Sequence, residues 1–239
     1  MNNHLPIVFK ICELMALDPV DTCLVLPQRT PSYITKAAEL FGFKFHLTDA
    51  SLIGDGIDFK AEPWIGVRAD RQNWVKSLHV QDVLTALTPT ANYGSRIFLS
   101  RRDTRCATNA SELELYLSGK GFRTIFPEEL SPADQIFIFR EAEIIVAIHG
   151  AGLAPLLYAQ PGGALTQLIE ILHAGHMTDV YRVMAQQVGV SWIGVQGRLK
   201  PEYIRDAYAF ENPFKTHSLD NFHVDLRALD IAFEHANVC

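Results

Sequence analysis

The sequence predicts an α/β protein whose second part is Rossmann-like. Short apolar runs of strand length alternate with helical segments through most of the chain, and this alternation favours parallel strand pairing. A length of 239 residues allows one large domain or two small ones. Residues 88–94 crowd Pro, Asn and Gly together, which is typical of a linker or a domain boundary.

Before this boundary we expect two strands and two helices. They are a strand at 22–27, a helix at 32–41, a strand at 43–48 and a helix at 74–87. Residues 49–71 are rich in turn signals and carry no regular period.

After the boundary the alternation is more regular. The expected strands lie at 96–100, 122–126, 144–148, 165–171 and 190–195, and the expected helices at 109–120, 131–142, 151–158 and 177–188. Asn109 precedes Glu112 at the spacing of a capping box. The final helix carries Phe222, Leu226, Leu229 and Phe233 on one face, which must pack on another element.

Composition excludes several classes of protein. Hydrophobic residues make up 48% and charged residues 20%, as in ordinary globular domains. The net charge of −6 disfavours nonspecific binding to nucleic acid. The apolar runs are too short for a membrane span, and the N-terminus lacks the features of a signal peptide. Four widely spaced cysteines indicate reduced thiols without a structural zinc site: Cys12, Cys23, Cys106 and Cys239.

The sequence HGAG follows the expected strand at 144–148. His149, Gly150, Ala151 and Gly152 would stand at the carboxyl end of that strand and the start of the next helix. Glycines allow close approach of a ligand, and a helix start offers free N–H groups to an anion. The alternative is an ordinary tight turn, and Pro155 replaces the third glycine of a dinucleotide fingerprint.

Two further groups stand at strand ends of the same predicted sheet. Arg101, Arg102 and Arg105 follow the strand at 96–100, and the arginine fork suits phosphate oxygens. Glu170, near the end of the strand at 165–171, could accept hydrogen bonds from ribose hydroxyls. The alternatives are a surface salt-bridge cluster and a solvated strand end. One ligand containing a diphosphate and a ribose would explain all of these residues.

The sequence offers little that would hold a metal. Asp55 and Asp58 are the nearest approach to a carboxylate pair, and two loop histidines such as His173 and His176 are usually not metal ligands. The sequence also lacks a P-loop and a nucleophile elbow. Arginines, His149 and a helix dipole would then stabilise a leaving diphosphate. This favours a metal-independent nucleotide-sugar transferase over a kinase, which needs magnesium.

The chain resembles glycosyltransferase family 61, which includes bacterial capsular-polysaccharide enzymes, plant xylan-decorating transferases and animal O-linked N-acetylglucosaminyltransferases. The resemblance depends on motifs in a fixed order: SRRD (100–103), GF before a strand (121–122), PEELS (127–131), HGAGL (149–153) and PGG (161–163), then a strand containing Glu170. It is strong over 97–195 and weaker over 25–43 and 221–233.

The resemblance implies a GT-B arrangement, in which two Rossmann-like domains face a cleft, and an inverting, metal-independent transfer from a nucleotide sugar, most plausibly UDP-linked. It places Arg101 and Arg102 near the diphosphate, His149 to Gly152 at the phosphates and Glu170 at the ribose. Residues 126–128 would lie near the nucleobase of the donor. The implied domains are a truncated acceptor-side domain at 1–90, a nucleotide-sugar-binding domain at 91–215 and a C-terminal helix at 216–239 that packs back on the N-terminal domain.

The N-terminal side departs from the family pattern. Relatives carry a longer acceptor domain with an Asn-aromatic-x-His stretch, of which His4-Leu5-Pro6 would be the remnant. We therefore expect a shortened acceptor domain, through a wrong start codon, a truncated product or a native minimal form. The general base is not identified by the sequence, and its candidates are Asp70, Asp82, His79 and His46.

Two alternatives to an active transferase remain open. One is a remnant that binds nucleotide sugars without transferring them, and the other is a Rossmann dehydrogenase, which Pro155 disfavours. For the transferase we expect a glycan or lipid-linked glycan acceptor in surface polysaccharide synthesis. We also expect a cytoplasmic location with peripheral contact to the inner face of the membrane, and no nucleic-acid partner.

Overall fold

The computed structural model describes residues 5–54, 73–175, 178–198 and 219–238. Contacts divide the chain into two compact units, Met1–Thr88 with Ser131–Ala133, and Pro89–Leu130 with Asp134–Cys239. The division falls at the stretch rich in Pro, Asn and Gly that the sequence marked as a boundary.

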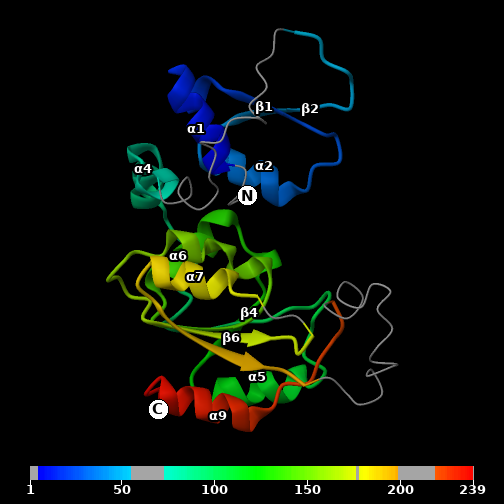
Figure 1. Ribbon diagram of the computed structural model, residues 1–239, viewed down its shortest axis with the longest axis vertical. Coiled ribbons are helices and arrows are strands. Elements are labelled where there is room, and N and C mark those ends of the chain that lie inside the picture. Colours follow the sequence, from blue (N-terminus) through cyan, green and yellow to red (C-terminus); the bar gives the residue numbers. More distant parts are fainter. Residues whose placement is uncertain (1–4, 55–72, 176–177, 199–218, 239) are drawn as a thin grey trace. The chain divides into compact units, whose positions relative to one another are not determined.

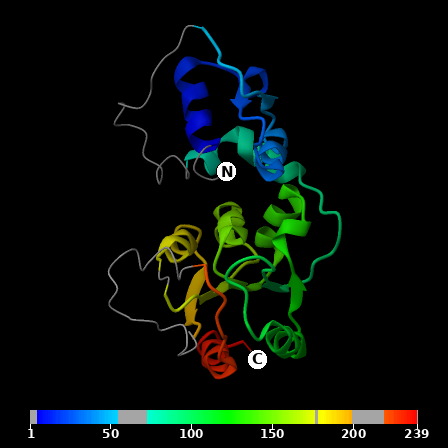
Figure 2. The ribbon, with the colours of Figure 1, turned by 90° about the vertical axis from the view of Figure 1, so that its right-hand side faces the viewer.

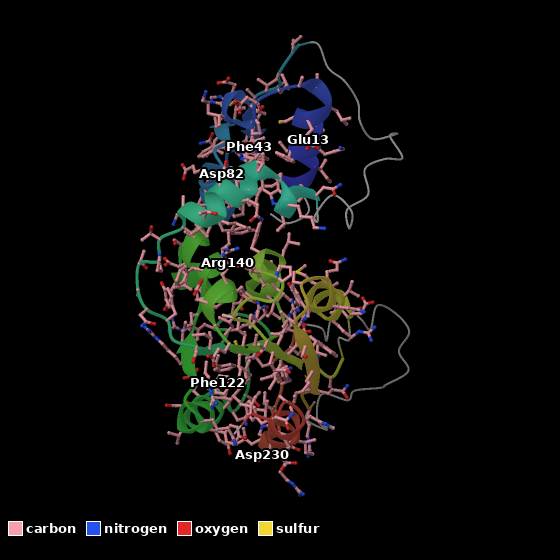
Figure 3. The ribbon with its side chains drawn as sticks, turned by 90° about the vertical axis from the view of Figure 1, so that its left-hand side faces the viewer. Glu13, Phe43, Asp82, Phe122, Arg140 and Asp230 are labelled. Atoms are coloured by element: carbon pink, nitrogen blue, oxygen red, sulfur yellow. The ribbon has the colours of Figure 1, made fainter. Side chains whose placement is uncertain are left out.

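The first unit surrounds a small aromatic core. Its elements are α1 (Leu5–Met15), a 3-10 turn η1 (Pro19–Asp21), β1 (Cys23–Leu26), α2 (Ser32–Leu40), β2 (Lys44–Leu47) and α4 (Leu78–Ala86), with β1 and β2 paired in parallel. Trp74 is fully buried, and its ring lies 4.9 Å from that of Phe41 and 5.2 Å from that of Phe9. Figure 3 labels Phe43, a third aromatic neighbour of Trp74, and Asp82 on α4.

Helix α1 was not among the elements that we expected from the sequence. It buries Leu5, Phe9 and Cys12, which follow one another at helical spacing. The strands β1 and β2 and the helices α2 and α4 lie within the ranges predicted for them, although α4 begins later than expected.

The second unit contains a five-stranded parallel sheet. Its strands are β3 (Arg96–Leu99), β4 (Arg123–Ile125), β5 (Ile144–Ile148), β6 (Gln167–Leu172) and β7 (Ser191–Gln196), in the order β4-β3-β5-β6-β7. Chain order reverses direction between β3 and β5, which makes this the topological switch point of a doubly wound sheet. The arrangement agrees with the predicted Rossmann-like α/β class.

Helices cover both faces of this sheet. Helices α5 (Ala110–Gly119) and α9 (Leu226–His235) lie on one face, and α6 (Pro132–Glu141) and α7 (Val180–Gln187) lie on the other (Figures 1 and 2). Two 3-10 segments, η2 (Pro127–Glu129) and η3 (Ala151–Tyr158), follow β4 and β5. Parallel strands covered in this way are mostly apolar on both faces, and every residue of β5 and β6 is buried.

Helix α9 corrects two expectations. It begins at Leu226, so Phe222 precedes it, and it packs on the second unit, whereas we expected packing on the N-terminal domain. Leu229 and Phe233 are buried in the same core as Leu113 and Leu117 of α5. The apolar face of α9 is therefore covered by its own unit.

Polar contacts fix the outer side of this helix pair. The Tyr116 hydroxyl donates to the Asp230 carboxylate, and Lys120 Nζ lies 3.5 Å from the same side chain. Burial, together with the Asp230 carboxylate, raises the pKa of Tyr116 above its ordinary value. Figure 3 labels Asp230 and Phe122 on this side of the sheet, where the Phe122 and Phe233 rings lie 5.6 Å apart.

Truncation of Leu229 tests the packing of α9. Leu229 is fully buried, so Leu229→Ala should lower the free energy of unfolding by about 2–5 kcal/mol, measured by urea denaturation. Ile231, two residues further on the same helix, is 57% exposed, so Ile231→Ala should change the stability by less than about 0.5 kcal/mol. Equal effects of the two substitutions would contradict this placement of the helix.

Candidate functional site

Two segments meet at the switch point of the second unit's sheet. The arginine loop, residues 100–109, follows the carboxyl end of β3, and the HGAG turn, residues 149–152, follows the carboxyl end of β5. β3 and β5 are paired neighbours, so their following segments leave the sheet side by side. In open parallel sheets this is the position where ligands bind.

Arg101 lies directly against the HGAG turn. Its Nη1 is 3.4 Å from the His149 carbonyl oxygen, and its side chain is only 18% exposed. A Cβ atom built on Gly150 would stand 1.7 Å from the same Nη1. Gly150 has an extended backbone that any residue can adopt, so the space for the guanidinium is the reason that glycine is needed here.

A carboxylate of the same loop orients Arg101. Asp103 accepts hydrogen bonds from Arg101 Nε at 3.1 Å and from Nη2 at 2.8 Å. Burial raises the pKa of Asp103, but hydrogen bonding and the charge of Arg101 outweigh it, so the net shift is downward. The Asp103 carboxylate thus occupies the Nε and Nη2 donors of Arg101, which a phosphate could otherwise bind.

Arg102 points to a different neighbour. Its guanidinium lies 3.6 Å from the centre of the Phe126 ring and pairs with Glu129, so it lies at the end of β4. Gly152 belongs to the same contact region, because a Cβ atom there would stand 2.8 Å from Cγ of Pro127. The segments that follow β3, β4 and β5 are thus packed on one another.

Arg105 is the third arginine of the loop and has an unusual backbone. Its φ of +59° lies in the left-handed region, which is unfavourable for a residue with a side chain. Its Nε is buried without a hydrogen-bond partner among the described residues. Burial, followed by the charge of Arg101, lowers the pKa of Arg105.

A buried carboxylate lies beneath the HGAG turn. Glu170 Oε1 is 2.5 Å from His149 Nδ1, and Glu170 Oε2 accepts from Trp192 Nε1 at 2.7 Å. An ionised carboxylate only accepts, so with Glu170 ionised the Nδ1 proton belongs to His149. Gly194, the register partner of Glu170, leaves room for the Trp192 ring, since a Cβ there would lie 2.6 Å from it.

This geometry differs from the role predicted for Glu170. The sequence placed the residue at a strand end, facing a ribose. In the structure β6 continues to Leu172, Glu170 is 0% exposed, and both of its oxygens are hydrogen-bonded within the protein. Glu170 therefore holds His149 in place. Trp192 was the residue in the sequence that could have indicated this role for Glu170, because a buried indole N–H needs a hydrogen-bond acceptor.

The candidates for a general base lie in the first unit or outside the described residues. His79 Nε2 is 2.7 Å from the Phe41 carbonyl oxygen, and its ring packs among the aromatic core, which gives it a structural role. His46 and Asp82 are exposed, and Asp70 lies outside the described residues. The structure does not bring any of the described candidates into the arginine loop's own unit.

The metal-binding alternatives find no support in the described part of the chain. Within it, no three His, Cys, Asp or Glu side chains come together as a metal site would require. His173 is buried, while His176, Asp55 and Asp58 lie outside the described residues. Cys12, Cys23 and Cys106 are free thiols. Among the helices described, none is long and apolar enough to pass through a bilayer.

The fold and site together define an α/β protein with a cationic site at the switch point of a parallel sheet. Comparison with protein families gives one match, described as Glycosyltransferase 61, over residues 20–168. The match covers more than half of the chain and includes the arginine loop and the HGAG turn, so the chain belongs to this glycosyltransferase family. The predicted family is confirmed. No curated protein matches the chain.

Family membership makes the chain a transferase that acts on a sugar donor and an acceptor. A Cβ at residue 150 then becomes a direct test of the site. Gly150→Ala should displace the Arg101 guanidinium, the movable end of a side chain, with little loss of stability. Binding of inorganic pyrophosphate should weaken about tenfold or more, because a hydrogen bond to a charged group contributes about 1.5–3 kcal/mol.

Isothermal calorimetry measures this binding. Gly119→Ala is the matched control, because a Cβ there meets nothing within 4 Å. In an Arg101→Ala background, Gly150→Ala should have no further effect. An equal loss of binding in both backgrounds would show that Gly150 acts independently of Arg101.

Glu170→Gln tests the buried network. The amide nitrogen cannot accept, so one of the two donors, His149 Nδ1 or Trp192 Nε1, loses its acceptor inside the sheet. The free energy of unfolding should fall by about 1–3 kcal/mol, measured by urea denaturation. The ¹⁵N shifts of His149 should also show the loss of its fixed tautomer. Glu234→Gln, on the exposed side of α9, is the control; unchanged His149 shifts in Glu170→Gln would contradict the assignment.

Proposed function

We propose that this chain transfers a sugar from a uridine diphosphate sugar to a hydroxyl of a glycan acceptor, with inversion at the anomeric carbon and without a metal ion. The observation that carries the proposal is the convergence of Arg101 and His149 at the switch point of the sheet. Family membership supplies the class of reaction.

Charge stabilisation is the main requirement of this transfer. The bond between the anomeric carbon and the diphosphate oxygen breaks, and the electron pair leaves with the diphosphate. Arg101 and Arg105 supply positive charge and N–H donors where that charge develops, which is the task of a metal ion in other transferases. The start of η3, at Ala151 and Gly152, adds backbone donors.

The remaining parts of the donor have neighbours of suitable chemistry. Arg102 stacks on Phe126 and offers a flat, cationic surface at the end of β4. We propose that the uracil ring of the donor lies on this surface. The new bond forms between the acceptor oxygen and the anomeric carbon on the face opposite the leaving group. The hydroxyl proton passes to a general base, for which His46, Asp82 and Asp70 remain the candidates.

The biological setting is also part of the proposal. We propose a glycan or lipid-linked glycan of a surface polysaccharide as acceptor, in keeping with the resemblance to capsular-polysaccharide enzymes. The free thiols of Cys12, Cys23 and Cys106 suit a reducing compartment, so we place the reaction on the cytoplasmic side, with peripheral contact to the membrane. The N-terminal unit would be the acceptor side and residues 91–215 the donor side.

Titration with UDP tests the donor site. The chain should bind UDP equally well with and without EDTA. Arg101→Ala should weaken binding about tenfold to a hundredfold, through the loss of one hydrogen-bonded charge. Arg123→Ala is the matched control. Arg123 is the first residue of β4, so this substitution also removes one positive charge, but at the opposite, amino end of the strands.

The outcomes separate the alternatives. Binding of UDP that disappears in EDTA would contradict the metal-free mechanism. Binding without sugar transfer to any acceptor would favour a binding remnant over an active enzyme. Binding of NAD in place of UDP would favour the dehydrogenase.

A further inference from the structure

The arginine loop is held by a segment from the far end of the chain. We call residues 219–224 the strap. They lead into α9 and run past the carboxyl ends of the strands, the side toward which the β6 arrow points (Figure 1). The strap pairs with the loop in parallel: Phe222 N donates to the Cys106 carbonyl at 3.1 Å, and Thr108 N donates to the Phe222 carbonyl at 2.8 Å. This pairing lies directly beside Arg105.

Two more hydrogen bonds from the strap reach Arg105 and the residue that follows it. Arg105 N donates to the Leu219 carbonyl at 3.1 Å. Cys106 N donates to Oδ1 of Asn221 at 3.0 Å. The backbone N–H groups of Arg105 and Cys106 are therefore both hydrogen-bonded to the strap.

The end of the loop is fixed in the same way. Asn109 Nδ2 donates to the Val224 carbonyl at 2.9 Å, and Val224 N donates to Asn109 Oδ1 at 3.0 Å. Asn109 stands at the N-cap of α5, but its side chain makes no capping bond there. The amide that the sequence predicts as a cap thus connects the loop to the strap.

The strap in turn is anchored to the sheet. Phe222 is 1% exposed, and a Cβ on Gly197 would stand 2.1 Å from its ring. His223 and Arg198 exchange backbone hydrogen bonds of 2.7 and 2.9 Å just after β7. The strap therefore connects the end of β7 with a loop that follows β3, and two strands, β5 and β6, separate β3 from β7 in the sheet.

The backbone conformation of Arg105 explains why the loop needs the strap. A residue with a side chain persists at φ of +59° only where its surroundings impose that conformation, and the strap bonds impose it here. The conformation places Arg105 near Arg101, a like charge, with a buried Nε that lacks a hydrogen-bond partner among the described residues. Two cations held together in this way suit a ligand with more than one negative charge.

We propose that the strap, through Asn221, is a positioning element that holds Arg105 in its left-handed conformation as the second cation of the diphosphate site. This inference rests on the proposed function. Asn221 itself is exposed, and in this proposal it acts through its hydrogen bond to Cys106 N and so through the neighbouring Arg105.

The test compares UDP binding by wild type, Asn221→Ala, Arg105→Ala and the double variant. Asn221→Ala should raise the Kd about fivefold, the effect of one net hydrogen bond. In the Arg105→Ala background the same substitution should change the Kd by less than about twofold, because the group that it positions is gone. Urea denaturation of each variant verifies that all are folded at the temperature of the titration.

Asn92→Ala is the matched control. Its Oδ1 also accepts from a backbone amide, that of Gly94, in a loop before β3 and so at the other end of the strands. This variant should bind UDP as wild type does. Unchanged binding by Asn221→Ala would overturn the inference, and an equal loss in both backgrounds would reduce the strap to a structural role. Failure of the wild type to bind UDP would instead reject the proposed function.

Discussion

The buried carboxylate of Glu170 is the constraint on which the site in the second unit depends. A carboxyl group inside a parallel sheet must be hydrogen-bonded within the protein, since water cannot reach it. Glu170 meets this condition through His149, which follows β5, and Trp192 on β7, so one side chain connects three adjacent strands. The orientation of His149 follows from this network, and the HGAG turn in turn determines where Arg101 can lie.

Local sequence pattern predicted most of the second unit's fold. β5 coincides with its predicted range because five consecutive apolar residues flanked by polar ones specify a fully buried strand. The strand at 165–171 was predicted one residue too short at its end, and this small difference changed the interpretation of Glu170 from an exposed strand end to a buried group. Strand boundaries depend on pairing with neighbours, in this case β7, which the local pattern does not contain.

The site residues show the same division between local and distant information. The arginines and the HGAG turn were found because their residue types and their positions after strands suffice to suggest anion binding. Asn109 was interpreted as a helix cap because Glu112 stands at the right spacing; its side chain does donate to Glu112, but its backbone partner is Val224, 115 residues away. The strap was missed for this reason, and Phe222 was assigned to a helix face when its ring instead fills the space left open by Gly197.

The ion pair between Arg101 and Asp103 makes ligand entry an exchange of one anion for another. Asp103 is 70% exposed, and such a pair contributes about 1 kcal/mol or less, so a strong competitor displaces it at little cost. A singly charged ion such as chloride gains too little to replace a carboxylate that is tethered two residues away. A diphosphate, the ligand that we propose for this site, would meet several cationic groups at once and gain enough. The loop would thereby carry its own competing anion, which disfavours small, singly charged ions.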